Sequence, residues 1–189
     1  GAFSPVSSNP SYAFSTLLQV RFIGGSFVAF GTSQYSGAPA YVLTSADGLN
    51  WAAPVFTNTP VSVESLAFGG GRFLSADFRT SVDGINWQAP ASPYFSRVSG
   101  LGYGNGMFLA VKTPYFEPYA SVATSADGLA WETRVGFGAA GLAVHGGGQF
   151  ITFKQERRAN SADGINWTSA PFPLRYITGA AYGDGRFIV

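Results

Sequence analysis

The sequence predicts an all-β fold, a β-propeller of four-stranded antiparallel blades or an arc of a larger propeller. One hairpin motif recurs four times and a second recurs five times, and glycine is too frequent for any helix of about ten residues. We expect a single domain over residues 1–189, with four complete repeats and the start of a fifth. A flat β-solenoid or an open β-meander is the alternative architecture. The approximate blades are residues 17–56, 61–92, 97–135, 139–171 and, in part, 175–189.

The first motif is S-x-D-G-x-x-W, and its four copies contain all four tryptophans of the chain. Its Asp-Gly step suits a tight turn between two strands, because glycine and Asp both accept the positive φ that such turns need. Each copy is therefore interpreted as a β-hairpin. The copies are Ser45–Trp51, Ser81–Trp87, Ser125–Trp131 and Ser161–Trp167.

The second motif alternates with the first and consists of an aromatic residue, a glycine-rich turn, and Phe followed by a short apolar run. Two hairpins in series give a four-stranded unit, whose strands we call A to D. The second motif joins A to B, and the Asp-Gly turn joins C to D. Stacking such units face to face buries both of their apolar faces. The five copies are Phe22–Phe27, Phe68–Phe73, Tyr103–Phe108, His145–Phe150 and Tyr182–Phe187.

The S-x-D-G-x-x-W hairpin resembles the Asp-box repeat of sialidase-like and related propellers, whose usual form is S-x-D-x-G-x-T-W. Every copy here lacks one residue between Asp and Gly, which marks a related subclass of blade. The resemblance implies a structural role, in which the Asp carboxylates accept hydrogen bonds from turn N–H groups and the tryptophans lie between blades. The residues with this structural role are Ser45, Asp47, Gly48, Trp51, Asp83, Gly84, Trp87, Asp127, Gly128, Trp131, Asp163, Gly164 and Trp167.

The composition excludes several functions. A net charge of +1 comes from scattered residues, so no basic stripe for nucleic acid is expected. The chain has no cysteine for a thiolate site and no apolar run long enough for a membrane span. Two lysines among many Ser, Thr, Gly and Tyr favour an extracellular, cell-surface or virion protein.

No catalytic or metal site is predicted. His145, the only histidine, takes the position of an aromatic residue in the other copies, which favours packing over catalysis. Each Asp-Gly turn offers one carboxylate, too few for a metal ion. A sialidase needs arginines and a Tyr–Glu pair, and glycosidases in general need two carboxyl groups. The available residues, in no recognisable signature, are Arg97, Arg134, Arg175, Glu64, Glu117 and Glu132.

Other short motifs have structural explanations. Asn166-Trp167-Thr168 fits the N-glycosylation pattern, but its Trp belongs to the repeat and the segment should pair as a strand. The turn at Gly69-Gly70-Gly71 opens no helix, so it lacks the N–H array of a phosphate loop. No cofactor is expected.

The B–C and D–A connections should meet at one end of the blades, which we call the connection end. The interval from the B-strand Phe to the Trp is 24, 14, 23 and 17 residues, so the first and third blades carry extensions at residues 32–40 and 113–121. Insertions at one end of a repeat protein usually carry function. Aromatic and arginine side chains there suit sugar stacking or a protein hot spot, or they cover the blade ends. The candidate binding residues are Tyr35, Tyr94, Phe95, Arg97, Tyr115, Phe116, Tyr119, Arg134 and Arg175.

These observations favour a non-catalytic binding or scaffold module for a protein or glycan, with a sialidase-like glycoside hydrolase as the alternative. Residues 175–189 begin a fifth A–B hairpin whose second strand has no predicted partner. We expect further blades of the parent chain or self-association to cover it, or closure by residues 1–16.

Overall fold

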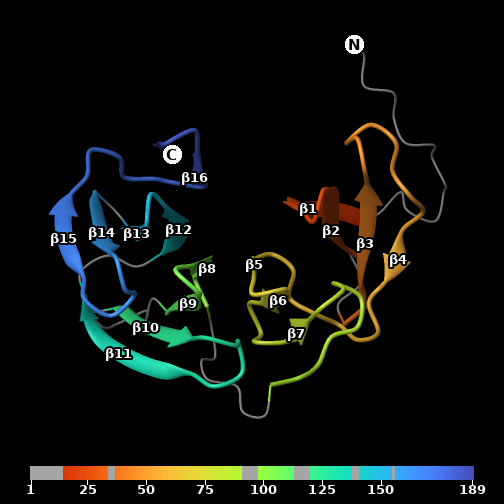
Figure 1. Ribbon diagram of the computed structural model, residues 1–189, viewed down its shortest axis with the longest axis horizontal. Helices are drawn as coiled ribbons and strands as arrows, with labels where there is room; N and C mark the ends of the chain where they lie inside the picture. Colours follow the sequence, from red (N-terminus) through yellow and green to blue (C-terminus); the bar gives the residue numbers. More distant parts are fainter. Residues whose placement is uncertain (1–14, 34–36, 91–97, 113–119, 138–140, 155) are drawn as a thin grey trace. The chain divides into compact units, whose positions relative to one another are not determined.

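The computed structural model describes residues 15–33, 37–90, 98–112, 120–137, 141–154 and 156–189, and within these ranges it contains strands and no helix. The strands form antiparallel meanders in which each strand pairs with the next along the chain (Figure 1). Three of the sheets have four strands, as the repeat predicts. The number of blades, and whether they form an open arc or a closed ring, stay predictions.

The first sheet joins four strands in the order β1-β2-β3-β4. It belongs to the first of two compact units, which contains residues 1–64 and 83–87. A bulge between Leu17 and Gln19 shifts the register of β1 on β2. The strands are β1 (Ser15–Ile23), β2 (Ser26–Ser33), β3 (Ala40–Ser45) and β4 (Val55–Phe56).

The other sheets belong to the second unit, which contains residues 65–82 and 88–189. They are a three-stranded second sheet, four-stranded third and fourth sheets, and a two-stranded hairpin. The first strands of successive sheets, β5, β8, β12 and β16, contact one another in that order. The strands are β5 (Leu66–Gly69), β6 (Arg72–Ser75), β7 (Thr80–Ser81), β8 (Gly100–Gly104), β9 (Met107–Lys112), β10 (Ala120–Ser125), β11 (Glu132–Phe137), β12 (Leu142–Gly146), β13 (Gln149–Lys154), β14 (Arg157–Ser161), β15 (Thr168–Pro171), β16 (Ala181–Gly183) and β17 (Arg186–Ile188).

The A–B turns have the geometry that the sequence predicts. At Asn105 and Gly106 the φ angles are 50° and 79°, and the corresponding pairs in the other four copies are also positive. Two successive positive φ angles define a type I′ turn, which matches the twist of the strands that it joins. In all five hairpins the aromatic residue of strand A lies opposite the Phe of strand B, as Tyr103 does with Phe108.

The second sheet has three strands where the repeat predicted four. Its third strand, β7, contains only two residues, and among the described residues, which stop at Pro90, the expected fourth strand is represented by one bridge between Thr80 and Gln88. The connection before β7 is tight: Phe78 has a φ of 62° and its N–H donates to the carbonyl of Ser75. A two-residue strand offers little ladder for a partner, and Pro90 has no N–H to extend it.

Two hydrophobic clusters join successive sheets of the second unit. One contains Leu74 and Phe78 of the second sheet with Leu101 and Phe108 of the third. The other contains residues of the third and fourth sheets, with Leu109, Val111, Val122, Phe150 and Ala159 at its centre. Since the clusters cross from sheet to sheet, the sheets of this unit are stacked face to face.

Candidate functional site

The Asp-Gly turns show why their acids are structural. Asp47 Oδ1 accepts hydrogen bonds from the backbone N–H groups of Leu49 and Asn50, each at 2.8 Å, and from the hydroxyl of Ser45 at 3.0 Å. Its Oδ2 accepts a further bond from the Asn50 side chain at 2.8 Å. Asp83, Asp127 and Asp163 also accept the two backbone bonds, so the hydrogen bonds expected from the turn chemistry are confirmed.

These hydrogen bonds also set the ionisation of the carboxyls. The backbone N–H of Asn50 holds the pKa of Asp47 well below its usual range, and that of Asn166 does the same for Asp163. The pKa of Asp127 is lowered chiefly by the N–H of Ala130. A carboxylate that accepts several N–H bonds stays ionised at neutral pH and is a poor general acid.

Each Trp of the motif folds back on its own turn. The indole Nε1 donates to the carbonyl of the motif glycine, at 2.7 Å for Trp87 on Gly84 and at 3.0 to 3.2 Å in the other copies. The ring of Trp131 packs edge-on against the ring of Phe78 in the second sheet, with 5.0 Å between the ring centroids. Trp167 lies against the cluster that joins the third and fourth sheets. In the second unit the tryptophans therefore pack between sheets, as predicted.

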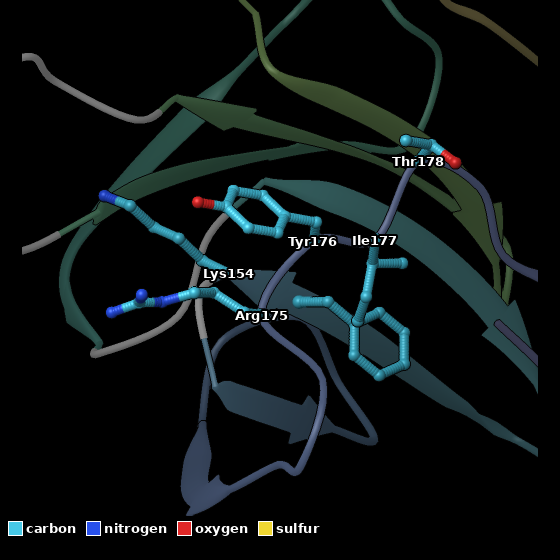
Figure 2. A pocket seen from close by; sticks show the side chains of 6 residues that line it. Lys154, Arg175, Tyr176, Ile177 and Thr178 are labelled. Carbon is cyan, nitrogen blue, oxygen red and sulfur yellow. The ribbon is translucent and has the colours of Figure 1, made fainter.

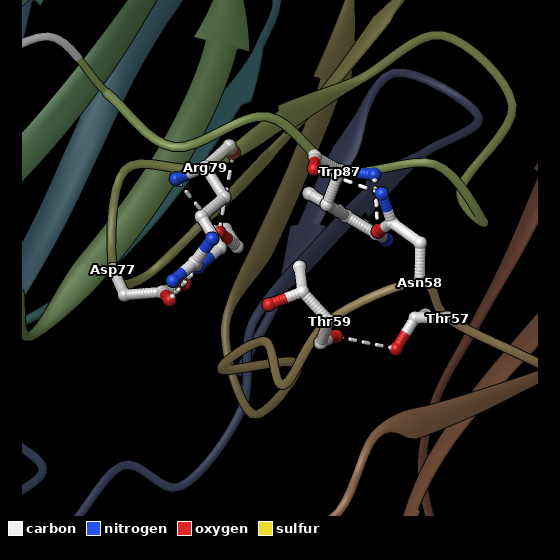
Figure 3. A network of polar contacts seen from close by, with 7 residues as sticks. Thr57, Asn58, Thr59, Asp77, Arg79 and Trp87 are labelled. Atoms are coloured by element: carbon white, nitrogen blue, oxygen red, sulfur yellow. Dashed lines mark hydrogen bonds and ion pairs between the residues drawn. The ribbon is translucent and has the colours of Figure 1, made fainter.

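Trp87, in the first unit, is the most buried of the four, with 3% of its surface exposed. Figure 3 shows Asn58 beside it. Asn58 Oδ1 accepts a hydrogen bond from the backbone N–H of Trp87 at 2.9 Å, and Asn58 Nδ2 donates to the backbone carbonyl of Trp87 at 3.3 Å. The backbone N–H of Asn58 also donates to the carbonyl of Ile85. One asparagine thus fixes the end of this hairpin.

Asp77, an acid that the repeat did not explain, has a local structural partner. It forms an ion pair with Arg79 at 2.9 Å and accepts a hydrogen bond from Ser75 at 2.6 Å (Figure 3). The Ser75 hydroxyl is also close to the carbonyl of Arg79, at 3.1 Å. Among the residues that the structure describes, no group of three acids and histidines could hold a metal ion.

His145 has the packing role that the repeat predicts. Its ring lies 4.8 Å from that of Phe150 and covers Gly104, where a Cβ would be 2.0 Å from the imidazole. Asn105 Nδ2 donates to the carbonyls of Gly148 and Ala162, so its Oδ1 is left to face His145 Nε2 at 3.2 Å. Nε2 therefore carries the proton of the neutral ring. Burial lowers the pKa of His145, which keeps the ring neutral at physiological pH.

The connection end of the fourth sheet contains a shallow pocket of about 180 Å³. Its walls come from the end of β13 and from the segment that follows β15. In Figure 2 the amino group of Lys154, the guanidinium of Arg175 and the hydroxyl of Tyr176 point to the same side. The lining residues are Phe153, Lys154, Arg175, Tyr176, Ile177 and Thr178.

Backbone contacts hold this pocket in place. The carbonyl of Glu156 accepts a hydrogen bond from the N–H of Phe172 at 2.7 Å, and the N–H of Glu156 donates to the carbonyl of Leu174 at 3.1 Å. The rings of Phe153 and Phe172 lie 5.1 Å apart, and Glu156 forms an ion pair with Arg175 at 3.7 Å. The segment before Arg175 is therefore fastened to the turn between β13 and β14.

Of the candidate binding residues, Arg175 lies in this pocket and is exposed. Arg134 lies in β11, opposite Val122 of β10. Lys154, Tyr176, Ile177 and Thr178 were not predicted, although Tyr176 follows Arg175 directly and belongs to the same connection. The remaining candidates, Tyr35, Tyr94, Phe95, Arg97, Tyr115, Phe116 and Tyr119, lie outside the described residues.

Within the described part of the chain, no helical segment has the length and hydropathy that a bilayer crossing requires.

No protein-family model matches the chain, and neither does any curated protein. Among solved structures, a glutaminyl cyclase from Myxococcus xanthus has 12% identity and a TM-score of 0.49, over 92% of this chain and 89% of that one. A GH43 glycoside hydrolase, engineered to display both endo-xylanase and exo-arabinofuranosidase activity, has 19% identity and a TM-score of 0.45, over 89% of this chain and 44% of that one. A further glycoside hydrolase has 12% identity and a TM-score of 0.29, over 93% and 61%. At these values the likenesses assign no activity to the chain.

Proposed function

We propose that the chain is a non-catalytic binding or scaffold module that recognises a glycan or a protein through its connection end. The supporting observation is the pocket formed by Lys154, Arg175 and Tyr176. It lies at the connection end, where we expect the binding residues from the sequence. Extracellular, cell-surface or virion location belongs to the same proposal.

The chemistry of the pocket favours an acidic sugar. Tyr176 is 86% exposed, and an exposed aromatic face is a good platform for the apolar face of a sugar ring. Lys154 and Arg175 beside it supply two cations, and the guanidinium can bind a carboxylate with two parallel hydrogen bonds. Glu156 shares Arg175, so the ligand carboxylate would take over part of this ion pair. A volume of about 180 Å³ is below the roughly 300 Å³ of small drug sites and suits one sugar unit of a longer chain.

The non-catalytic part of the proposal rests on the carboxyl groups. A glycosidase places two of them on either side of the bond that it cleaves. The described residues that line the pocket include no Asp or Glu. The motif aspartates are engaged in their own turns.

Tyr115, Phe116 and Tyr119 are proposed to extend the binding surface at the third repeat. Changing the three together to Ala should abolish partner binding and leave the thermal unfolding midpoint nearly unchanged. A loss of folding would assign these side chains to the core.

A glycan array tests the proposal. We expect the protein to bind carboxylated glycans, and we expect Arg175→Ala and Tyr176→Ala each to weaken binding at least about tenfold. Arg72→Ala is the matched control, since Arg72 begins β6 beside an A–B turn. Failure to bind any glycan would favour a protein partner, and release of a cleaved sugar would establish the hydrolase.

A further inference from the structure

The third Asp-Gly turn differs from the first at a single position. Ser125–Trp131 reads S-A-D-G-L-A-W, and Ser45–Trp51 reads S-A-D-G-L-N-W. Ala130 therefore stands where the first turn has Asn50. The second and fourth turns also have asparagine at this position, so Ala130 is the exception among the four copies.

This exception changes the hydrogen bonds of the motif carboxylate. In the other three turns the asparagine Nδ2 donates to Oδ2 of the aspartate, at 2.7 to 2.8 Å. Asp127 keeps the bonds to Oδ1, from the backbone N–H groups of Leu129 and Ala130 and from the Ser125 hydroxyl. Its Oδ2 accepts no hydrogen bond from the residues that the structure describes. An acceptor that the motif elsewhere satisfies is thus open to a ligand in this turn.

Asp127 and Ala130 line a pocket of about 360 Å³, which we call the turn-end pocket. Its walls come from the A–B turn of the third sheet, at Gly106 and Met107, and from the end of β10 with the Asp-Gly turn that follows. All of them belong to one sheet of the second unit, at the end opposite the connection end. Because the alanine side chain ends at Cβ, it leaves free the space that an asparagine carboxamide would fill.

The turn-end pocket combines negative charge with apolar surface. Asp127 and Glu132 are the charged residues among those described that line it, and both are acids. The backbone N–H of Ala130 lowers the pKa of Asp127, which is therefore ionised at neutral pH. Met107 and Trp131 add a thioether and a half-buried indole. A matching ligand donates hydrogen bonds, carries positive charge and has an apolar part.

We propose that the turn-end pocket binds a guanidinium group, as carried by an arginine side chain. The planar guanidinium presents N–H donors as a carboxamide does, so it can donate to Oδ2 of Asp127 in place of the missing asparagine. Its charge is attracted by Asp127 and Glu132, and the indole of Trp131 can add a cation–π contact. The methylene stem of arginine suits the apolar wall at Met107. A neutral sugar would supply the hydrogen bonds without the charge. This ligand is distinct from the acidic glycan proposed for the connection end.

An NMR titration of the isotope-labelled protein with the peptide acetyl-Gly-Arg-Gly-amide tests the proposal. We expect shifts in the amide signals of residues 124–132 and none in those of residues 153–158 and 172–178. The same peptide with citrulline in place of arginine keeps the shape and loses the charge, so it should bind at least about tenfold more weakly. Free arginine serves as a second probe. Tighter binding of the peptide would indicate a protein as the source of the guanidinium, and tighter binding of free arginine would indicate a small molecule.

Ala130→Asn is the sharpest variant, because it restores the sequence of the first turn. Its carboxamide should donate to Oδ2 of Asp127 and fill the turn-end pocket, so peptide binding should fall at least about tenfold while the thermal midpoint stays the same or rises. Leu129→Asn is the matched control: Leu129 is 52% exposed and does not line the pocket, so this variant should bind like the wild type. No binding of either arginine probe, undiminished binding by Ala130→Asn, or equal binding of the arginine and citrulline peptides would each overturn the proposal.

Discussion

Replacing Trp87 by Ala should destabilise the fold strongly. A tryptophan buries roughly 150–250 Å² of surface, which corresponds to about 4–6 kcal/mol at 25 cal/mol per Å². Trp87 is nearly fully buried, and its indole also donates the 2.7 Å hydrogen bond to Gly84. The Ala side chain keeps a small part of the burial. We therefore expect a loss of about 3–5 kcal/mol in the free energy of unfolding.

The assay is chemical denaturation followed by circular dichroism, since fluorescence changes with the number of tryptophans. Trp51→Ala is the matched control: Trp51 has the same place in its motif and the same type of bond to its glycine, but it is only half-buried. Its loss should be clearly smaller. A loss below about 1 kcal/mol for Trp87→Ala, or equal losses for the two variants, would refute the burial argument.

Three further predictions concern the polar groups of the repeats. Asn58→Ala should cost about 1 kcal/mol in the same denaturation assay, because it removes the acceptor of the Trp87 N–H; an unchanged midpoint would contradict this. Burial lowers the pKa of His145 in the folded state, so the stability that the neutral ring contributes should be lost as pH falls below about 6.5. In His145→Tyr the thermal midpoint should therefore change less between about pH 5 and 7 than in the wild type. The lowered pKa of Asp163 stabilises the fold above about pH 4 and this contribution is lost in stronger acid, so Asp163→Asn should melt earlier at pH 7 and show a smaller further drop in acid; an equal acid drop in the two proteins would contradict it.

The local parts of the fold could be predicted because they depend on few neighbouring residues. The A–B turns follow from the Gly-Gly, Asn-Gly and Asp-Gly pairs, and the hydrogen bonds of Asp47 follow from the spacing of Ser, Asp and Gly. The short interval from Phe73 to Trp87 indicated a tight connection. It did not indicate that β7 would contain only two residues. In the structure the connection before β7 contains the Asp77–Arg79 ion pair and the buried Phe78.

Contacts between sheets were harder to predict. Gly104 and Gly146 were read with their turns, whereas in the structure they receive a ring from the next sheet. Of the residues that line the pocket at the connection end, Arg175 is a candidate from the sequence because it is a cation near the variable connections, whereas Tyr176 and Lys154 are not candidates. Tyr176 and Lys154 lie close together because the backbone of Glu156, after β13, forms hydrogen bonds with Phe172 and Leu174, after β15. Backbone hydrogen bonds of this kind do not depend on side-chain identity, so the sequence does not predict them.

Amide hydrogen exchange with a bound carboxylated glycan tests most directly whether the connection end recognises the ligand. We predict that binding slows exchange at residues 153–158 and 172–178, which contain Lys154, Arg175 and Tyr176, and leaves the Asp-Gly turn at residues 126–130 unchanged. Slower exchange at residues 126–130, with no change around Arg175, would contradict the proposed binding site.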